Sequence, residues 1–213
     1  MIIDSHQHFW NYDPIKDAWI DDSMEVIRRD FLPKDLKPLL DENAIDGCIA
    51  VQADQSENET DFLLSCAQKN KFIKGVIGWL DLTSDNLESR LNHYIKNPLF
   101  KGLRHIVQAE KDDCLLREDV QKGISKLANY NLTYDILIFP SQLDAAIELV
   151  KKFPKQQFVL DHIAKPTISY TVDELWRLNI IELSKNQNVS CKLSGLVTET
   201  NNYTFNDIDF YPY

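Results

Sequence analysis

The chain has 213 residues, of which 44% are hydrophobic and 26% are charged, a composition typical of globular proteins and not of disordered ones. Its 33 acidic and 23 basic residues give a formal net charge of −10, which argues against electrostatic binding of nucleic acid or anionic lipid. No segment stays apolar over the roughly 18 residues that a membrane-spanning helix needs, and the N-terminus lacks a signal-peptide pattern, so we expect a cytoplasmic protein.

Short runs rich in β-branched and aromatic residues alternate along the chain with longer segments of helical period. This alternation is typical of βαβ units and a parallel sheet. Seven strands are expected at residues 2–8, 46–53, 72–80, 100–107, 132–139, 157–163 and 189–196. Helices are expected within residues 32–44, 59–70, 83–97, 117–131, 140–154 and 171–186. The last helix is expected to begin with a capping box formed by Thr171 and Glu174.

The expected strands begin about every 30 residues, and right-handed crossovers would wind such a chain around one axis. We therefore expect one domain over residues 1–213 with an α/β fold, an incomplete TIM-type (β/α)₈ barrel in which seven strands are present and the eighth is missing. An open, doubly wound sheet is the alternative. The chain contains neither of the glycine-rich phosphate loops that would support it.

Two histidines, His6 and His8, stand one residue apart at the end of the first expected strand. Alternate side chains of a strand point to the same side, so both imidazoles would face one way at the end of the barrel where active sites are built. A pair of strand-end histidines that only bond to each other is the alternative. Because other expected strands also end in polar residues, the pattern favours one shared site for a small molecule.

His162, after the sixth strand, can join this pair to form either a metal site or a group of donors that polarises a carbonyl. Asp161 beside it is equally suited to bonding a backbone group or to supporting a histidine. On the fourth strand, Arg104 and His105 face opposite sides. Alternation with Leu103 and Val107 places His105 toward the interior, and a bulge or a twist at the strand end would be needed to bring Arg104 in.

Further candidates stand near other strand ends. Lys165 is suited to holding an oxyanion or a substrate hydroxyl, or it is a solvated loop residue. Lys192 lies within the seventh strand, where a buried ammonium needs a partner. Trp10, Gln52 and Trp79 either line a substrate or belong to the core.

Several segments together resemble a known family: IIDSHQHFW, ETDFLL, IKGVIGWLDL, FKGLRHIVQ, FVLDHIAKP and CKLSGLVTE, in this order. They are similar to the amidohydrolase-related family of metal-dependent hydrolases, in particular to its L-fuconolactonase-like members. The resemblance implies a TIM-type barrel that hydrolyses the ester of a small sugar lactone, such as L-fuconolactone or L-rhamnonolactone, in carbohydrate catabolism. It implies that His6, His8 and His162 surround the carbonyl oxygen, directly or through one divalent metal such as zinc.

The resemblance also implies that Arg104 and His105 bind substrate. Two features depart from the family pattern. The fifth expected strand, LTYDILIF, carries no histidine, which leaves both a metal-bound and a metal-independent site open. The family's eighth strand ends in a Gly-Ser-Asp-Trp-Pro motif whose aspartate is the expected base for water, and this motif is absent, so weak activity is expected of the chain as given.

Two other functions remain as alternatives at this point. One is an inactive fragment that pairs with a partner protein through an open sheet edge. The other is a metal-dependent deaminase or decarboxylase with the same fold. The oligomeric state does not follow from the sequence.

Overall fold

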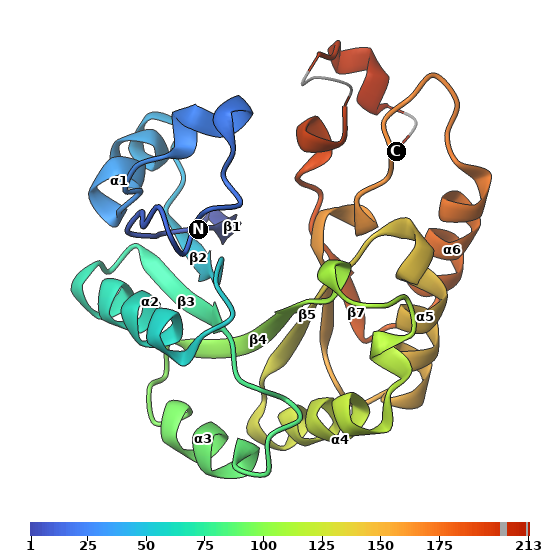
Figure 1. The fold of residues 1–213 in the computed structure, drawn as a ribbon, viewed down its shortest axis with the longest axis horizontal. Coiled ribbons are helices and arrows are strands. Elements are labelled where there is room, and N and C mark those ends of the chain that lie inside the picture. The colour runs from blue at the N-terminus through green and yellow to red at the C-terminus, as the bar shows by residue number, and fades with distance from the viewer. Residues whose placement is uncertain (201–203, 212) are drawn as a thin grey trace. The chain divides into compact units, whose positions relative to one another are not determined.

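The computed structural model describes residues 1–200, 204–211 and 213 (Figure 1). Its sheet has seven strands in the order of the sequence: β1 (Ile3–Gln7), β2 (Gly47–Val51), β3 (Ile73–Gly78), β4 (Phe100–Ile106), β5 (Thr133–Leu137), β6 (Phe158–Leu160) and β7 (Val189–Cys191). The pairs β1–β2, β2–β3, β4–β5, β5–β6 and β6–β7 are parallel. A doubly wound sheet would reverse its strand order at a switch point, so the incomplete TIM-type barrel is confirmed.

Helices connect the strands. They are α1 (Pro33–Glu42), α2 (Glu57–Lys69), α3 (Leu87–Tyr94), α4 (Glu118–Leu127), α5 (Leu143–Lys152) and α6 (Glu174–Ser184). The capping box predicted from Thr171 is wrong, because α6 begins only after Asp173. The Asp173 carboxylate accepts hydrogen bonds from the backbone N–H groups of Leu175 and Trp176, and this satisfies the first turn without Thr171. Among the described residues, no helix combines the length and the apolar character that crossing a bilayer requires.

The chain divides into two compact units, which are described separately below. Unit 1 comprises residues 1–79 and 96–101, with β1, β2, β3 and the start of β4. Unit 2 comprises residues 80–95 and 102–213, with the rest of β4 and β5 to β7. The expectation of one domain over residues 1–213 stays a prediction.

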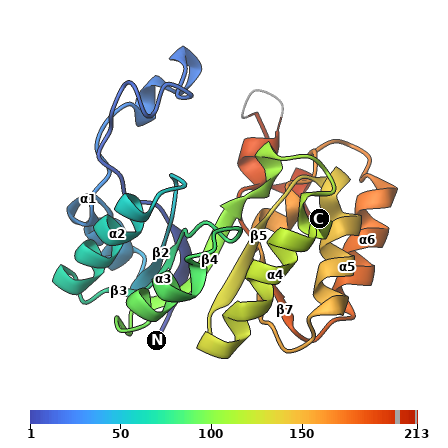
Figure 2. The same cartoon turned by 60° about the horizontal axis from the view of Figure 1, so that its bottom comes forward.

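In unit 1, helix α2 packs on β3, as Figures 1 and 2 show. Leu63 of the helix and Val76 of the strand are fully buried. Burying such side chains stabilises the fold by about 2 kcal/mol each. Thr60 joins the two elements through its hydroxyl, which donates to the Trp79 carbonyl and accepts from the Trp79 N–H at 2.9 Å. The end of β3 is thereby fixed to α2.

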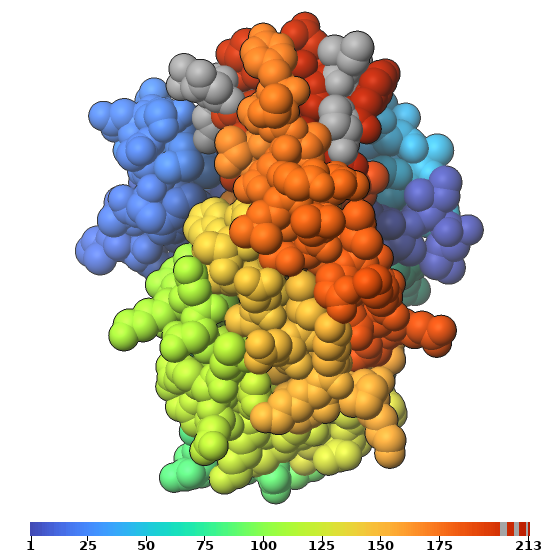
Figure 3. Space-filling view, turned by 90° about the vertical axis from the view of Figure 1, so that its right-hand side faces the viewer, coloured from blue at the N-terminus to red at the C-terminus, as the bar shows by residue number. Residues whose placement is uncertain are grey.

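In unit 2, helices α5 and α6 pack together and form the outer surface seen in gold and orange in Figure 3. Beneath them the core includes Tyr134 of β5 and Phe158 of β6, whose rings meet edge to face at 6.4 Å between centroids. The predicted strands over 157–163 and 189–196 are shorter in the structure and end at Leu160 and Cys191. The polar residues that follow them are therefore on loops.

Candidate active site

In unit 1, His6 and His8 bring their imidazoles together at the end of β1. Their Nε2 atoms are 3.0 Å apart, and the rings meet edge to face at 4.8 Å between centroids. The Nδ1 atom of His8 lies 2.8 Å from the carbonyl oxygen of Val51 in β2. A carbonyl only accepts, so Nδ1 carries the proton, and in the neutral ring Nε2 is left with its lone pair. Phe9, 1% exposed, anchors the strand end in the core.

This donor set fits a divalent metal. Zinc binds imidazole nitrogen at about 2.0–2.1 Å, so two nitrogens separated by 3.0 Å can be neighbouring ligands of one ion. Metal-binding histidines commonly donate their second ring N–H to a backbone carbonyl, as His8 does to Val51. The pair therefore has the spacing of two metal ligands, and His8 also has the orientation of one.

The other candidates in unit 1 follow the ends of its three complete strands. Trp10 pairs with Phe31 through two backbone hydrogen bonds of 3.0 Å, and the two rings stack at 4.6 Å. Gln52 is completely buried directly after β2, and its N–H donates to the Ile77 carbonyl. Trp79 follows β3 and is held by Thr60. Their proposed contacts with substrate stay predictions.

In unit 2, His162 lies in a turn of unusual backbone geometry. His162, Ile163, Ala164 and Lys165 all have φ between 52° and 58°, the left-handed region. For residues with a side chain this conformation costs roughly 1–2 kcal/mol each. The turn is held in part by Trp176, whose indole N–H donates to the Ile163 carbonyl at 2.8 Å. Strain of this kind, maintained by specific contacts, is common at functional sites.

The segment after β7 holds the His162 ring. Ser194 Oγ lies 2.9 Å from His162 Nδ1. Gly195 has φ +72°, and a Cβ placed on it would be 2.8 Å from His162 Cγ and Nδ1. Only glycine therefore allows the imidazole to lie where it does. Burial lowers the pKa of His162, while the Asp161 carboxylate opposes this shift, so the neutral ring is favoured.

A buried network of four charged residues lies beside His162. Arg104 Nη1 is 3.0 Å from Asp161 Oδ2, and Lys192 Nζ is 2.8 Å from Asp161 Oδ1 and also pairs with Asp135. All four side chains are at most 7% exposed. Burial raises the pKa of Asp135, and Lys192 opposes the rise. Two cations and two carboxylates compensate one another, as buried charges require.

The network decides which side chain of β4 faces the polar side. Arg104 is in register with Asp135, so it needs no bulge. The inference from alternation with Leu103 that His105 faces this side is wrong, because Leu103 is buried on the other side of β4, away from the network. His105 instead lies 3.2 Å from Glu110 and lines a cavity of about 180 Å³ with Thr83 and Cys114.

Lys165 is not a solvated loop residue. Its Nζ is 3.1 Å from Glu199 Oε1 and 5.5 Å from the ring centre of Phe139, and its side chain is 19% exposed. Sequence reasoning does not single out Asp135, although an aspartate within an otherwise apolar strand indicates that it pairs with a buried cation. Within unit 2, Arg104 lies inside β4, and His162 and Lys165 lie in the turn that follows β6. A joint site of His6, His8 and His162 stays a prediction.

The amidohydrolase family model, Amidohydro_2, matches residues 3–213. The chain belongs to the amidohydrolase family. By family it is therefore a hydrolase, and the predicted resemblance is confirmed. This amidohydrolase is 34% identical over 198 residues to an L-fucono-1,5-lactonase of Burkholderia ambifaria, a match that covers 92% of the chain and 68% of the relative. It is 37% identical over 204 residues to the L-fucono-1,5-lactonase of Burkholderia multivorans, covering 92% and 69%.

The fold is similar to a crystal structure of an amidohydrolase from Burkholderia multivorans with bound Zn. The TM-score is 0.93 at 36% sequence identity, over 98% of this chain and 75% of that one. These relatives do not favour the deaminase, decarboxylase or inactive-fragment alternatives.

Proposed function

We propose that this amidohydrolase hydrolyses the ester bond of a small sugar lactone, L-fucono-1,5-lactone or a relative such as L-rhamnonolactone. The observation that carries the proposal is the His6–His8 pair, oriented by the Val51 carbonyl, in a chain similar to two L-fucono-1,5-lactonases over 92% of its length. Such a pair at the carboxyl end of a barrel strand is suited to acting on a carbonyl oxygen.

The proposed catalytic residues are His6, His8 and His162. They polarise the lactone carbonyl, directly or through a metal; water adds to the carbonyl carbon and gives up a proton, and the ring oxygen takes up a proton and leaves as an alcohol. Because the Val51 carbonyl holds the proton of His8 on Nδ1, the His8 Nε2 lone pair does not donate to the carbonyl oxygen; it serves instead to bind the metal or to accept a proton from the attacking water. The proposed substrate-binding residues are Arg104, His105, Lys165, Trp10, Gln52 and Trp79.

We further propose that His6, His8 and His162 hold one divalent metal, zinc or a similar ion. When bound, the metal supplies a Lewis acid that polarises the carbonyl. The Zn in the Burkholderia multivorans amidohydrolase supports this, as does the 3.0 Å separation of the two Nε2 atoms. The lowered pKa of His162 supports it as well, since a metal ligand must be neutral.

The partner that we propose is a small neutral lactone, and not nucleic acid or a membrane. We place the protein in the cytoplasm. Its four cysteines, Cys48, Cys66, Cys114 and Cys191, are free thiols in the structure, as is usual in a reducing compartment.

The proposal is tested by following acid release in a pH-stat. L-fucono-1,5-lactone, L-rhamnonolactone and a simple carboxylic ester are each supplied to the protein, with zinc and with a chelator. Hydrolysis of the sugar lactones above the uncatalysed rate, in preference to the ester, is expected. A protein that accelerates neither lactone in either condition would contradict the proposed function, while equal rates with zinc and chelator would contradict the metal.

A further inference from the structure

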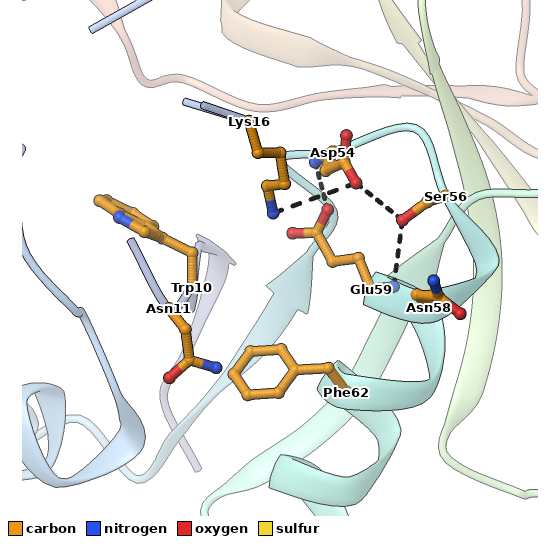
Figure 4. Close-up of a pocket in the computed structure, with 8 residues that line it drawn as sticks. All are labelled: Trp10, Asn11, Lys16, Asp54, Ser56, Asn58, Glu59 and Phe62. Carbon is orange, nitrogen blue, oxygen red and sulfur yellow. Dashed lines mark hydrogen bonds and ion pairs between the residues drawn. The ribbon is translucent and has the colours of Figure 1, made fainter. Parts of the chain in front are cut away.

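Unit 1 contains a cavity of about 320 Å³ at the carboxyl ends of β1 and β2 (Figure 4). Two of the residues that line it, Trp10 and Asp54, come two residues after His8 and three residues after Val51. Its lining consists of Trp10, Asn11, Lys16, Asp54, Ser56, Asn58, Glu59 and Phe62. The volume is within the range of small-molecule sites, and the lining combines aromatic walls with a few polar groups, as such sites do.

The aromatic walls are Trp10 and Phe62, which Figure 4 shows on one side of the cavity and at its base. Trp10 is rigid, because its backbone forms two hydrogen bonds with Phe31 and its ring stacks on the Phe31 ring. A fixed indole offers a large flat surface without further loss of conformational entropy on binding. Such a surface suits the C–H face of a pyranose-type ring.

The polar groups stand opposite these walls. Lys16 Nζ is 4.0 Å from Asp54 Oδ2, which also accepts a hydrogen bond of 2.7 Å from Ser56 Oγ. Glu59, 6% exposed, accepts hydrogen bonds from the backbone N–H groups of Ala53 and Asp54 and so fixes the loop that carries Asp54. The polar side of the cavity is therefore held in place, like the aromatic side.

The chemistry of these groups matches neighbouring hydroxyls. A hydroxyl both donates and accepts, so an ammonium next to a carboxylate can bond two adjacent hydroxyls of one ring. Lys16 carries one positive charge, whereas Asp54 and Glu59 provide two carboxylates, so the cavity does not favour an anion. A neutral ring with several hydroxyl groups fits it better than a phosphate or an acid.

We propose that this cavity binds the hydroxyl-bearing part of the sugar lactone, with Trp10 against the ring and Lys16 and Asp54 on its hydroxyl groups. This inference rests on the proposed function, because it makes the cavity the specificity subsite of the same reaction. It assigns Lys16 and Asp54, which neither catalyse nor bind metal, to the choice of substrate.

The direct test is calorimetric titration with L-fucose, a neutral ring that carries no ester and cannot be hydrolysed. We expect a Kd of about 1 mM for the wild-type chain and about tenfold weaker binding for Lys16→Gln and for Trp10→Leu. Matched controls are Lys34→Gln and Trp19→Leu, which change an exposed lysine and a 62% exposed tryptophan outside the cavity. Both controls should bind like the wild type.

Two outcomes would overturn the inference: no binding of L-fucose, or binding that Lys16→Gln and Trp10→Leu leave unchanged although circular dichroism shows that they are folded. A kinetic comparison separates this failure from failure of the proposed function. Lys16→Gln should lower kcat/KM about tenfold on L-fucono-1,5-lactone but not on δ-valerolactone, which has no hydroxyl groups. Equal loss on both lactones overturns the subsite alone, whereas no hydrolysis of either by the wild type contradicts the lactonase.

Discussion

His162 Nδ1 and Ser194 Oγ are joined at 2.9 Å, across 32 residues of sequence. This contact fixes the ring plane of an imidazole in a left-handed turn, while Gly195 leaves the space in which the ring lies. One short segment after β7 thus determines where the His162 Nε2 atom points. A side chain held this firmly is what a catalytic or metal-binding role requires.

Replacement of Gly195 by alanine tests this arrangement. The added Cβ would collide with the imidazole, and φ +72° costs alanine about 1–2 kcal/mol, so Gly195→Ala should lower both stability and lactone hydrolysis.

The hydrogen bond from Ser194 gives a second prediction. Ser194→Ala should lower kcat with little loss of stability, and Ser194→Thr, which keeps the hydroxyl, should retain a normal kcat. Urea unfolding and kcat on the same preparations check both. Normal kcat in Ser194→Ala would show that the hydrogen bond does not position the ring.

The buried charge network predicts that replacing Lys192 destabilises the protein much more than replacing an exposed lysine. Lys192→Met would leave Asp135 and Asp161 without their shared cation, and we expect a loss of about 3–5 kcal/mol in the free energy of unfolding. Lys151→Met is the control, since its pair with Glu182 is exposed and should matter little. Urea denaturation measures both. Equal stability of the two variants would contradict the network.

Glu59 predicts a pH dependence of stability. Burial raises the pKa of its carboxyl above the ordinary 4.5, so the folded state binds its proton more tightly than the unfolded state does. The contribution of Glu59 to stability therefore decreases as the pH rises from about 4.5 through the folded pKa. The stability difference between wild type and Glu59→Gln should be more favourable to the wild type at about pH 4 than at about pH 7. Unfolding curves at both values check the sign, and the reverse order would refute it.

Zinc binding should depend on both histidines of β1. His8→Asn and His6→Asn should each lower the affinity for zinc by about tenfold to a hundredfold, because each removes a proposed ligand nitrogen. His93→Asn, which changes an exposed histidine of α3, is the control and should bind normally. Competition with a zinc indicator gives the affinities. An unchanged zinc affinity in His8→Asn would contradict the proposal that this histidine pair binds the metal.

Periodicity was sufficient to predict the order of strands and helices, since segments of helical period alternate with short runs that contain β-branched and aromatic residues. The seven-strand barrel and the placement of His6 and His8 on one side follow from that pattern. The local backbone geometry at the strand ends does not follow from that pattern. Nothing in the residues from Asp161 to Pro166 signals a left-handed turn, because tertiary contacts such as that of Trp176 stabilise it. Alternation did place Arg104 and His105 on opposite sides of β4, but both sides of this strand are buried, so the apolar neighbour Leu103 did not indicate which side carries the charged network.

The central claim is that the histidine pair of β1 drives hydrolysis of a sugar lactone. Its most direct measurement is the initial rate of acid release from L-fucono-1,5-lactone by the wild-type chain, by His93→Asn and by the double variant His6→Asn/His8→Asn. We predict equal rates for the first two and a rate lower by about 10²–10⁴ for the double variant. A double variant that hydrolyses the lactone as fast as the wild type would contradict the account.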